Sequence, residues 1–161
     1  MENNSTTPRI LVGVDGSDHS IGALHAAAEV AAAMNAHIRA VTVWEYPAMF
    51  YPVQHWTPAR DAKSLLIATL KKAFGTKPPD DLDTQILCGY APRVLINESR
   101  DADMLVLGSR GHGGFTGLLL GSVSAACAQH AHCPVLITHD DDPSRGPRDP
   151  RELAARSAAS R

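Results

Sequence analysis

The sequence predicts an α/β protein: a single domain with an open, twisted sheet of five parallel strands and helices on both of its faces. Two observations carry this prediction. Between Arg9 and His139, short apolar runs rich in β-branched residues alternate with segments in which apolar residues recur at helical spacing, the pattern of βαβ crossovers. The 161 residues, 44% of them hydrophobic and 20% charged, also have the composition of one globular domain with its own core.

Five runs have the composition and length of strands: Arg9–Val14, His37–Glu45, Leu82–Cys88, Asp103–Leu107 and Pro134–His139. The fourth run is almost continuously apolar, which is typical of a strand buried on both faces. The fifth is the last strand along the chain, and we expect it at an edge of the sheet. Parallel pairing requires a crossover between consecutive strands, and the intervening segments are long enough to supply one.

Four segments between these runs are predicted helices: Ile21–Met34 after a cap at Ser17 or Asp18, Pro58–Phe74, Pro92–Arg100 and Ser122–His130. The second has agreeing signals at both ends, because Thr57 is a capping residue, Pro58 suits the first helical position and Gly75 suits the end. The aromatic and proline-containing stretch Tyr46–Trp56 lacks a period, so we expect a loop over the domain edge, with a mobile lid as the alternative.

The two ends of the chain differ from the middle. Residues 1–8 are polar, and residues 140–161 carry three prolines and five charges of each sign without an apolar period. We expect a flexible N-terminal tail over 1–8, a ligand-binding domain over 9–139 and a disordered polar tail over 140–161.

Charge and cysteine content narrow the class of protein. The formal net charge is −2, which disfavours a nucleic-acid partner. Three cysteines without a CxxC pair favour a reduced compartment, and the polar, acidic N-terminus is unlike a signal peptide. No window holds about 18 uninterrupted apolar residues, so we expect a cytoplasmic protein with no membrane partner.

The glycines are concentrated in one segment. Six of the 12 lie between Gly108 and Gly121, where the fourth strand gives way to the last helix. Glycines admit backbone conformations closed to other residues and a close approach of a ligand. The N-terminus of the following helix favours an anion, and we expect the hydroxyls of Ser122 and Ser124 to act as additional donors. This construction suits phosphate at the carboxyl ends of the strands.

The spacing of these glycines shows which of the known phosphate-binding motifs the segment matches. No lysine follows as in a Walker A loop, and no GxGxxG follows the first strand. The segment instead reads G-x2-G-x9-G-S from Gly108 to Ser122. With ILVGVDGS at residues 10–17 and ADMLVLGSRG at 102–111, the chain resembles the ATP-binding type of the universal stress protein family over residues 8–139. The resemblance implies a Rossmann-like fold.

The resemblance also implies a site and partners. ATP would be the ligand, with Val43 meeting adenine through its backbone and Asp15 on the ribose or metal side, where Mg²⁺ would arrive only with the nucleotide. A homodimer through Pro134–His139 would cover the edge strand. His112 stands where relatives often carry Arg or Lys, so charge beside the phosphates would depend on pH. The implied nucleotide-binding residues are Gly13, Asp15, Val43, Leu107, Gly108, Arg110, Gly111, Gly121, Ser122, Val123 and Ser124.

The predicted function is therefore that of a nucleotide-binding regulatory dimer in a stress response, with slow or absent ATP hydrolysis and no assigned catalytic residue. Two alternatives remain open. One is an ATP-hydrolysing or phosphoryl-transferring enzyme in which Asp15 and a metal position the attacking group. The other is a dimeric interaction module that binds another adenine nucleotide, such as a cyclic nucleotide. Cys127, His130, His132 and Cys133 lack the spacing of a zinc site, and no metal is assigned to them.

Overall fold

The predicted fold class is confirmed. The computed structural model describes residues 7–46, 57–112 and 119–139. Within them five parallel strands form one open sheet in the order β3-β2-β1-β4-β5. The strands are β1 (Arg9–Gly13), β2 (His37–Trp44), β3 (Leu82–Cys88), β4 (Met104–Gly108) and β5 (Val135–Thr138). The strand order reverses between β1 and β4, and β5 lies at one edge, as expected.

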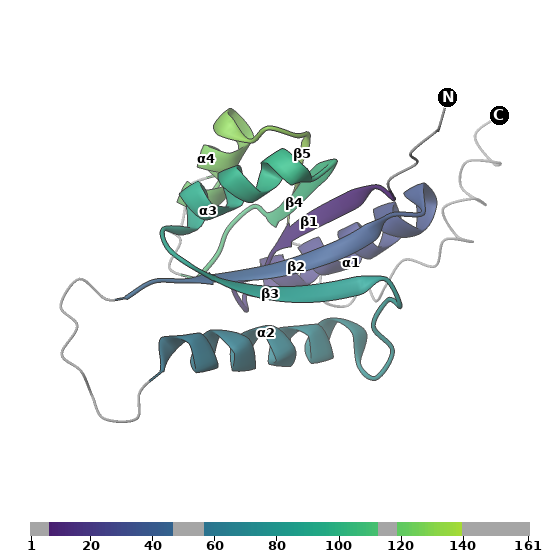
Figure 1. Ribbon diagram of the computed structural model, residues 1–161, viewed down its shortest axis with the longest axis horizontal. Coiled ribbons are helices and arrows are strands. Elements are labelled where there is room, and N and C mark those ends of the chain that lie inside the picture. The colour runs from purple at the N-terminus through teal and green to yellow at the C-terminus, as the bar shows by residue number, and fades with distance from the viewer. Residues whose placement is uncertain (1–6, 47–56, 113–118, 140–161) are drawn as a thin grey trace.

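Helices cover both faces of this sheet. Figure 1 shows α3 and α4 together on one side, while α1 and α2 lie on the other. The short turn Ser99–Asp101 of 3-10 helix follows α3. The four helices are α1 (Asp18–Met34), α2 (Pro58–Phe74), α3 (Ala91–Glu98) and α4 (Ser122–His130).

The core has two layers because successive strand residues point to opposite faces. On β1, Ile10 and Val12 pack toward α1 and α2, whereas Leu11 packs toward α3 and α4. The strand β4 is buried on both faces, with Val106 in the first layer and Leu105 in the second. The prediction from its continuous apolar run is thus confirmed.

The helix ends agree with the sequence signals at Ser17 and Gly75 but not at Thr57, and α3 ends at Glu98, before the expected Arg100. Ser17 caps α1, since its Oγ accepts the N–H of Ser20 at 3.2 Å. Gly75 ends α2 at φ +62°, in the left-handed region that favours glycine. Thr57 occupies the capping position of α2, but its side chain makes no capping hydrogen bond; its carbonyl oxygen instead accepts the N–H of Arg60 at 2.8 Å.

Some of the expectations concern residues that the structure does not describe. The disordered tail expected over 140–161, most of the tail over 1–8 and the loop after Tyr46 up to Trp56 lie outside the described residues. Among the helices that the structure describes, none has both the length and the apolar character to cross a membrane.

Candidate functional site

A pocket of about 330 Å³ opens at the carboxyl ends of β1, β2 and β4, next to the point where the strand order reverses. This is where open parallel sheets bind ligands. The structure brings all the site residues expected from the sequence into the lining of this one pocket: Gly13, Asp15, Val43, Leu107, Gly108, Arg110, Gly111, Gly121, Ser122, Val123 and Ser124.

His112, which the sequence placed beside the phosphates, also lines the pocket. The sequence did not indicate the remaining lining residues, Val14, Ser20, Val41, Ala91, Leu95 and Leu120. Val41 had a usable signal, since it lies two residues before Val43 and so points to the same face of β2. Leu95 had none, because only the packing of α3 over the sheet carries it to the pocket.

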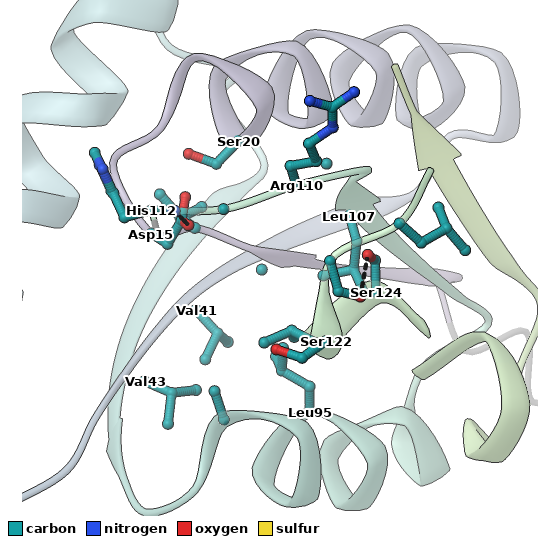
Figure 2. A pocket seen from close by; sticks show the side chains of 18 residues that line it. Asp15, Ser20, Val41, Val43, Leu95, Leu107, Arg110, His112, Ser122 and Ser124 are labelled. Carbon is teal, nitrogen blue, oxygen red and sulfur yellow. Dashed lines mark hydrogen bonds between the residues drawn. The ribbon is translucent and has the colours of Figure 1, made fainter. Parts of the chain in front are cut away.

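One end of the pocket is apolar. Figure 2 shows the side chains of Val41, Val43 and Leu95 gathered there, away from Asp15 and His112. The backbone of Val43 is the polar element of this end. The N–H of Val14 donates to the carbonyl oxygen of Val41 at 2.8 Å, so Val41 and, by alternation, Val43 turn their peptide groups toward β1. Because β1 ends at Gly13, the N–H and C=O of Val43 lie beyond its ladder.

The other end is organised by the Asp15 carboxylate. Its Oδ1 accepts the hydroxyl of Ser17 at 2.5 Å and the N–H of Ser17 at 3.0 Å. Its Oδ2 accepts the N–H of His112 at 2.9 Å. Asp15 therefore ties the loop between β1 and α1 to the glycine segment that follows β4.

These contacts set the charge state of Asp15. Burial raises the pKa of its carboxyl, but the hydrogen bonds from Ser17 and from the N–H of His112, with the nearby His112 side chain, outweigh burial. The pKa consequently lies below its ordinary value, and the carboxylate is ionised at neutral pH.

The glycines of this segment serve close packing. A Cβ on Gly111 would collide with Oδ2 of Asp15, and one on Gly108 would lie 2.6–2.7 Å from the Cβ and backbone of His19 in α1. Neither residue, nor Gly121, has a positive φ. The expected unusual backbone conformations are thus not found at these three positions. Small size is what the fold requires at Gly108 and Gly111, whereas a Cβ on Gly121 would meet only ordinary contacts, the nearest at 3.4 Å.

The segment ends at the N-terminus of α4. The N–H of Gly121 donates to the carbonyl oxygen of Ser109 at 2.7 Å, which fixes where the helix begins. No side chain caps α4 among the described residues, so the N–H groups of its first turn have no capping acceptor, and Gly121, Ser122 and Val123 of this helix end line the pocket. Ser122 is exposed there. The buried hydroxyl of Ser124, expected to be a ligand donor, lies within donating distance of Ser109 O (2.9 Å) and Gly121 O (3.0 Å) instead.

Metal-binding clusters are absent from the part of the chain that the structure describes, where no three His, Cys, Asp or Glu side chains gather. Cys127 is a residue of α4 and is fully buried in the core layer between this helix and the sheet. Its burial, with a contribution from Cys133, raises the pKa of the Cys127 thiol to about 11, so it stays protonated at neutral pH.

A sequence model of the universal stress protein family matches residues 6–139. The chain belongs to the universal stress protein family. A curated relative is the universal stress protein Rv2623 of Mycobacterium tuberculosis, 31% identical over 133 residues that cover 81% of this chain and 45% of the relative. The chain thus spans about half the length of the curated family members that it matches.

Solved universal stress protein structures share the fold. One, described as a complex with cAMP, is 27% identical with a TM-score of 0.56 and covers 83% of this chain and 98% of its own. The protein UspA from Lactobacillus plantarum is 25% identical with a TM-score of 0.61 and covers 83% of this chain and 99% of its own.

Proposed function

We propose that this universal stress protein binds an adenine nucleotide, with ATP as the main candidate, and acts through its bound state as a regulatory protein with slow or absent hydrolysis. The observation that carries the proposal is the division of one pocket into an apolar end with an open backbone edge and a polar end at a helix N-terminus.

The apolar end suits a purine base. Val41, Val43 and Leu95 offer apolar surface to the faces of a flat ring. The N–H and C=O of Val43, beyond the end of β1, offer one donor and one acceptor in the plane of the strand. Adenine presents an acceptor beside a donor on its pairing edge, so a single residue's backbone would satisfy both.

The polar end suits phosphate. The first turn of α4 presents N–H groups and the positive end of the helix dipole. The backbone of Arg110 lies next to Gly121, where α4 begins, and its exposed side chain gives this loop a cation. Asp15 lies as an anion against Gly111 and His112 in the same glycine segment, so Mg²⁺ brought by ATP would offset repulsion between its carboxylate and the phosphates.

The class of nucleotide has support from a relative. The structure described as a complex with cAMP covers most of this chain, and its ligand contains adenine and one phosphate. A cyclic nucleotide therefore competes with ATP as the ligand of the proposed site, while both share the chemistry of its two ends.

Regulation by binding is preferred over an enzymatic role because of the contacts of Asp15. Both of its oxygens accept hydrogen bonds from the protein, and its lowered pKa makes it a weak base. We therefore assign it to holding the loop and not to activating water. A homodimer through β5 and a cytoplasmic location, which the three free cysteines favour, complete the proposal.

The polar end of the pocket is tested with two variants, Ser122→Asp and Ser122→Asn, whose new side chains have nearly the same shape but differ in charge. Ser122 is exposed at the first position of α4, where a carboxylate stabilises the helix but repels a phosphate. We expect Ser122→Asp to weaken ATP binding at least about tenfold, or roughly 1.4 kcal/mol, in calorimetric titrations with and without Mg²⁺. Ser122→Asn should stay within about threefold of wild type.

Adenosine and cAMP are titrated in parallel, and phosphate release from ATP is followed. Adenosine should bind all three proteins alike, because it lacks the phosphate that the new carboxylate repels. Failure of the wild-type protein to bind any of these compounds contradicts the proposed function. Equal ATP affinities in the two variants would show that the phosphates lie elsewhere, and rapid phosphate release would favour the enzyme.

A further inference from the structure

The outer face of α2 carries an unusual concentration of positive charge. All four lysines of the chain, Lys63, Lys71, Lys72 and Lys77, lie in α2 or in the turn that follows it. With Arg60 they make five cations over residues 58–77, against the single carboxylate of Asp61. The chain as a whole has a net charge of −2, so the rest of the protein is clearly negative.

The helix geometry turns these charges outward. Ala62, Leu66 and Thr69 are buried against the sheet and α1. On the opposite side, Arg60, Ser64, Ile67 and Lys71 follow one another at spacings of four and three residues and are all exposed. Lys63 and Lys72 are exposed on the two flanks of this line.

An apolar side chain lies in the middle of the charged face. Ile67 is 56% exposed and sits between Lys63 and Lys71, one helical turn from each. Among the described residues, the ion pairs of the structure join Asp83 to His37 and Arg39, and none involves a lysine of α2. The lysine charges are thus available to a partner.

We propose that the outer face of α2, defined by Arg60, Lys63, Ile67, Lys71 and Lys72, docks an acidic protein segment that covers Ile67 with an apolar side chain of its own. Charge complementarity steers such a partner and selects against basic ones. The central Ile67 would supply the contact from which water is excluded, surrounded by the charged rim.

An acidic peptide fits this face better than other anionic partners. A 17-residue helix is about 25 Å long, and a nucleic acid lying along it would extend over the negative remainder of the protein. A membrane surface would require a broader apolar face than one exposed isoleucine. A short acidic segment meets the cations alone.

This surface is separate from the nucleotide pocket and from the proposed dimer edge. No α2 residue lines the pocket. The helix α2 packs on β2 and β3, near the edge of the sheet that is opposite to the β5 edge (Figure 1). A partner on α2 would therefore leave both the pocket and β5 accessible.

The test uses a fluorescein-labelled oligoglutamate peptide with one central leucine, titrated into the full chain by fluorescence anisotropy. Lys63→Glu with Lys71→Glu should weaken binding at least about tenfold, since two attractive contacts become repulsive. The matched control is Arg93→Glu with Arg100→Glu, the same charge change at exposed positions in and just after α3, on the other face. This control should stay within about threefold of wild type.

Further arms separate the outcomes. Ile67→Ser should lower the affinity for the leucine peptide but not for a peptide in which glycine replaces the leucine. Ser122→Asp should bind the leucine peptide like wild type, whether or not this variant has lost ATP binding. Backbone amide shifts on peptide addition should concentrate in residues 58–77. The proposal is wrong if the α2 and α3 variants lose equal affinity, if the peptide does not bind, or if duplex DNA or phosphatidylserine vesicles bind α2 more tightly than the peptide.

Discussion

At the scale of single residues, Asp15 decides the shape of the pocket's polar end. Its carboxylate accepts hydrogen bonds from Ser17, just before α1, and from the N–H of His112 in the glycine segment. His112 is 97 positions away from Asp15 in the sequence. The sequence indicated Asp15 as a ligand contact. Its full set of protein hydrogen bonds makes its first role the positioning of the two loops between which a ligand would enter.

The ionisation of Asp15 makes its contribution to stability dependent on pH. Its pKa is lowered in the folded protein, so the stabilisation is fully present above the unfolded value of about 3.9 and is lost as pH falls from there through the folded pKa. Asp15→Asn should reduce the free energy of unfolding by about 1.5–3 kcal/mol at neutral pH, because the charge-assisted hydrogen bonds are lost. The difference from wild type should shrink below about pH 4.

Urea unfolding of the two proteins across pH measures this difference. Asp18→Asn is the control, since Asp18 is exposed in the first turn of α1 and should cost under about 1 kcal/mol. A difference between wild type and Asp15→Asn that is independent of pH would show that the carboxylate is not held by these hydrogen bonds.

Gly111 provides a second prediction at this scale. Replacing glycine by alanine usually stabilises a protein by about 0.4–1 kcal/mol where the backbone allows it. At Gly111 the added Cβ would meet the Asp15 carboxylate, so we expect Gly111→Ala to destabilise by about 1–3 kcal/mol instead. At Gly22, inside α1, the nearest atom to an added Cβ is Oγ1 of Thr138 at 3.9 Å, and Gly22→Ala should stabilise.

Chemical denaturation of these two variants gives the sign of each change. Opposite signs are the expected result. If Gly111→Ala were as stable as wild type, the close approach between the two loops would not constrain this position, and a ligand would be the better reason for the glycine.

At the scale of elements, local signals predicted the helices and strands well, since each depends on residues close in sequence. The cap at Ser17 and the continuous apolar run of β4 are examples, and the structure confirms both. Thr57 shows the limit of such signals, because a capping residue in the capping position does not bond unless its side chain is oriented toward the free N–H groups.

The pocket could be predicted only in part. Glycine spacing and resemblance indicated the segment from Gly108 to Ser124, and strand alternation would have added Val41. Leu95 and Ser20 come from helices packed on opposite faces of the sheet, which no local pattern reveals. The hydrogen bond from the Ser124 hydroxyl to the carbonyl oxygen of Ser109 could not be predicted from the sequence either, because it depends on how the fold brings Ser109 next to α4.

At the scale of the whole molecule, the β5 edge of the sheet offers a way for two copies to assemble. At the β5 edge, the carbonyl oxygen of Pro134 accepts the N–H of Leu105 at 2.9 Å, and that of Thr138 accepts the N–H of Ser109, just after β4, at 2.7 Å. By alternation the peptide groups of Val135 and Ile137 point outward, away from β4. Two copies related by a twofold axis would pair these groups between antiparallel β5 strands and join their sheets.

Ile137→Pro and Ile137→Ala separate this pairing from side-chain packing. Both remove the isoleucine side chain, but only proline also removes the outward N–H, and an edge position tolerates that loss within the monomer. Sedimentation velocity over a range of concentrations should show dimers for wild type and Ile137→Ala. Ile137→Pro should dissociate at least about tenfold more readily, since a symmetric dimer loses two hydrogen bonds of roughly 0.5–1.5 kcal/mol each. Circular dichroism verifies that the variants remain folded. A wild-type protein that stays monomeric at every concentration would contradict the dimer and leave each pocket to act in a single copy. Variants that dissociate equally would show that backbone pairing through β5 does not hold the dimer together.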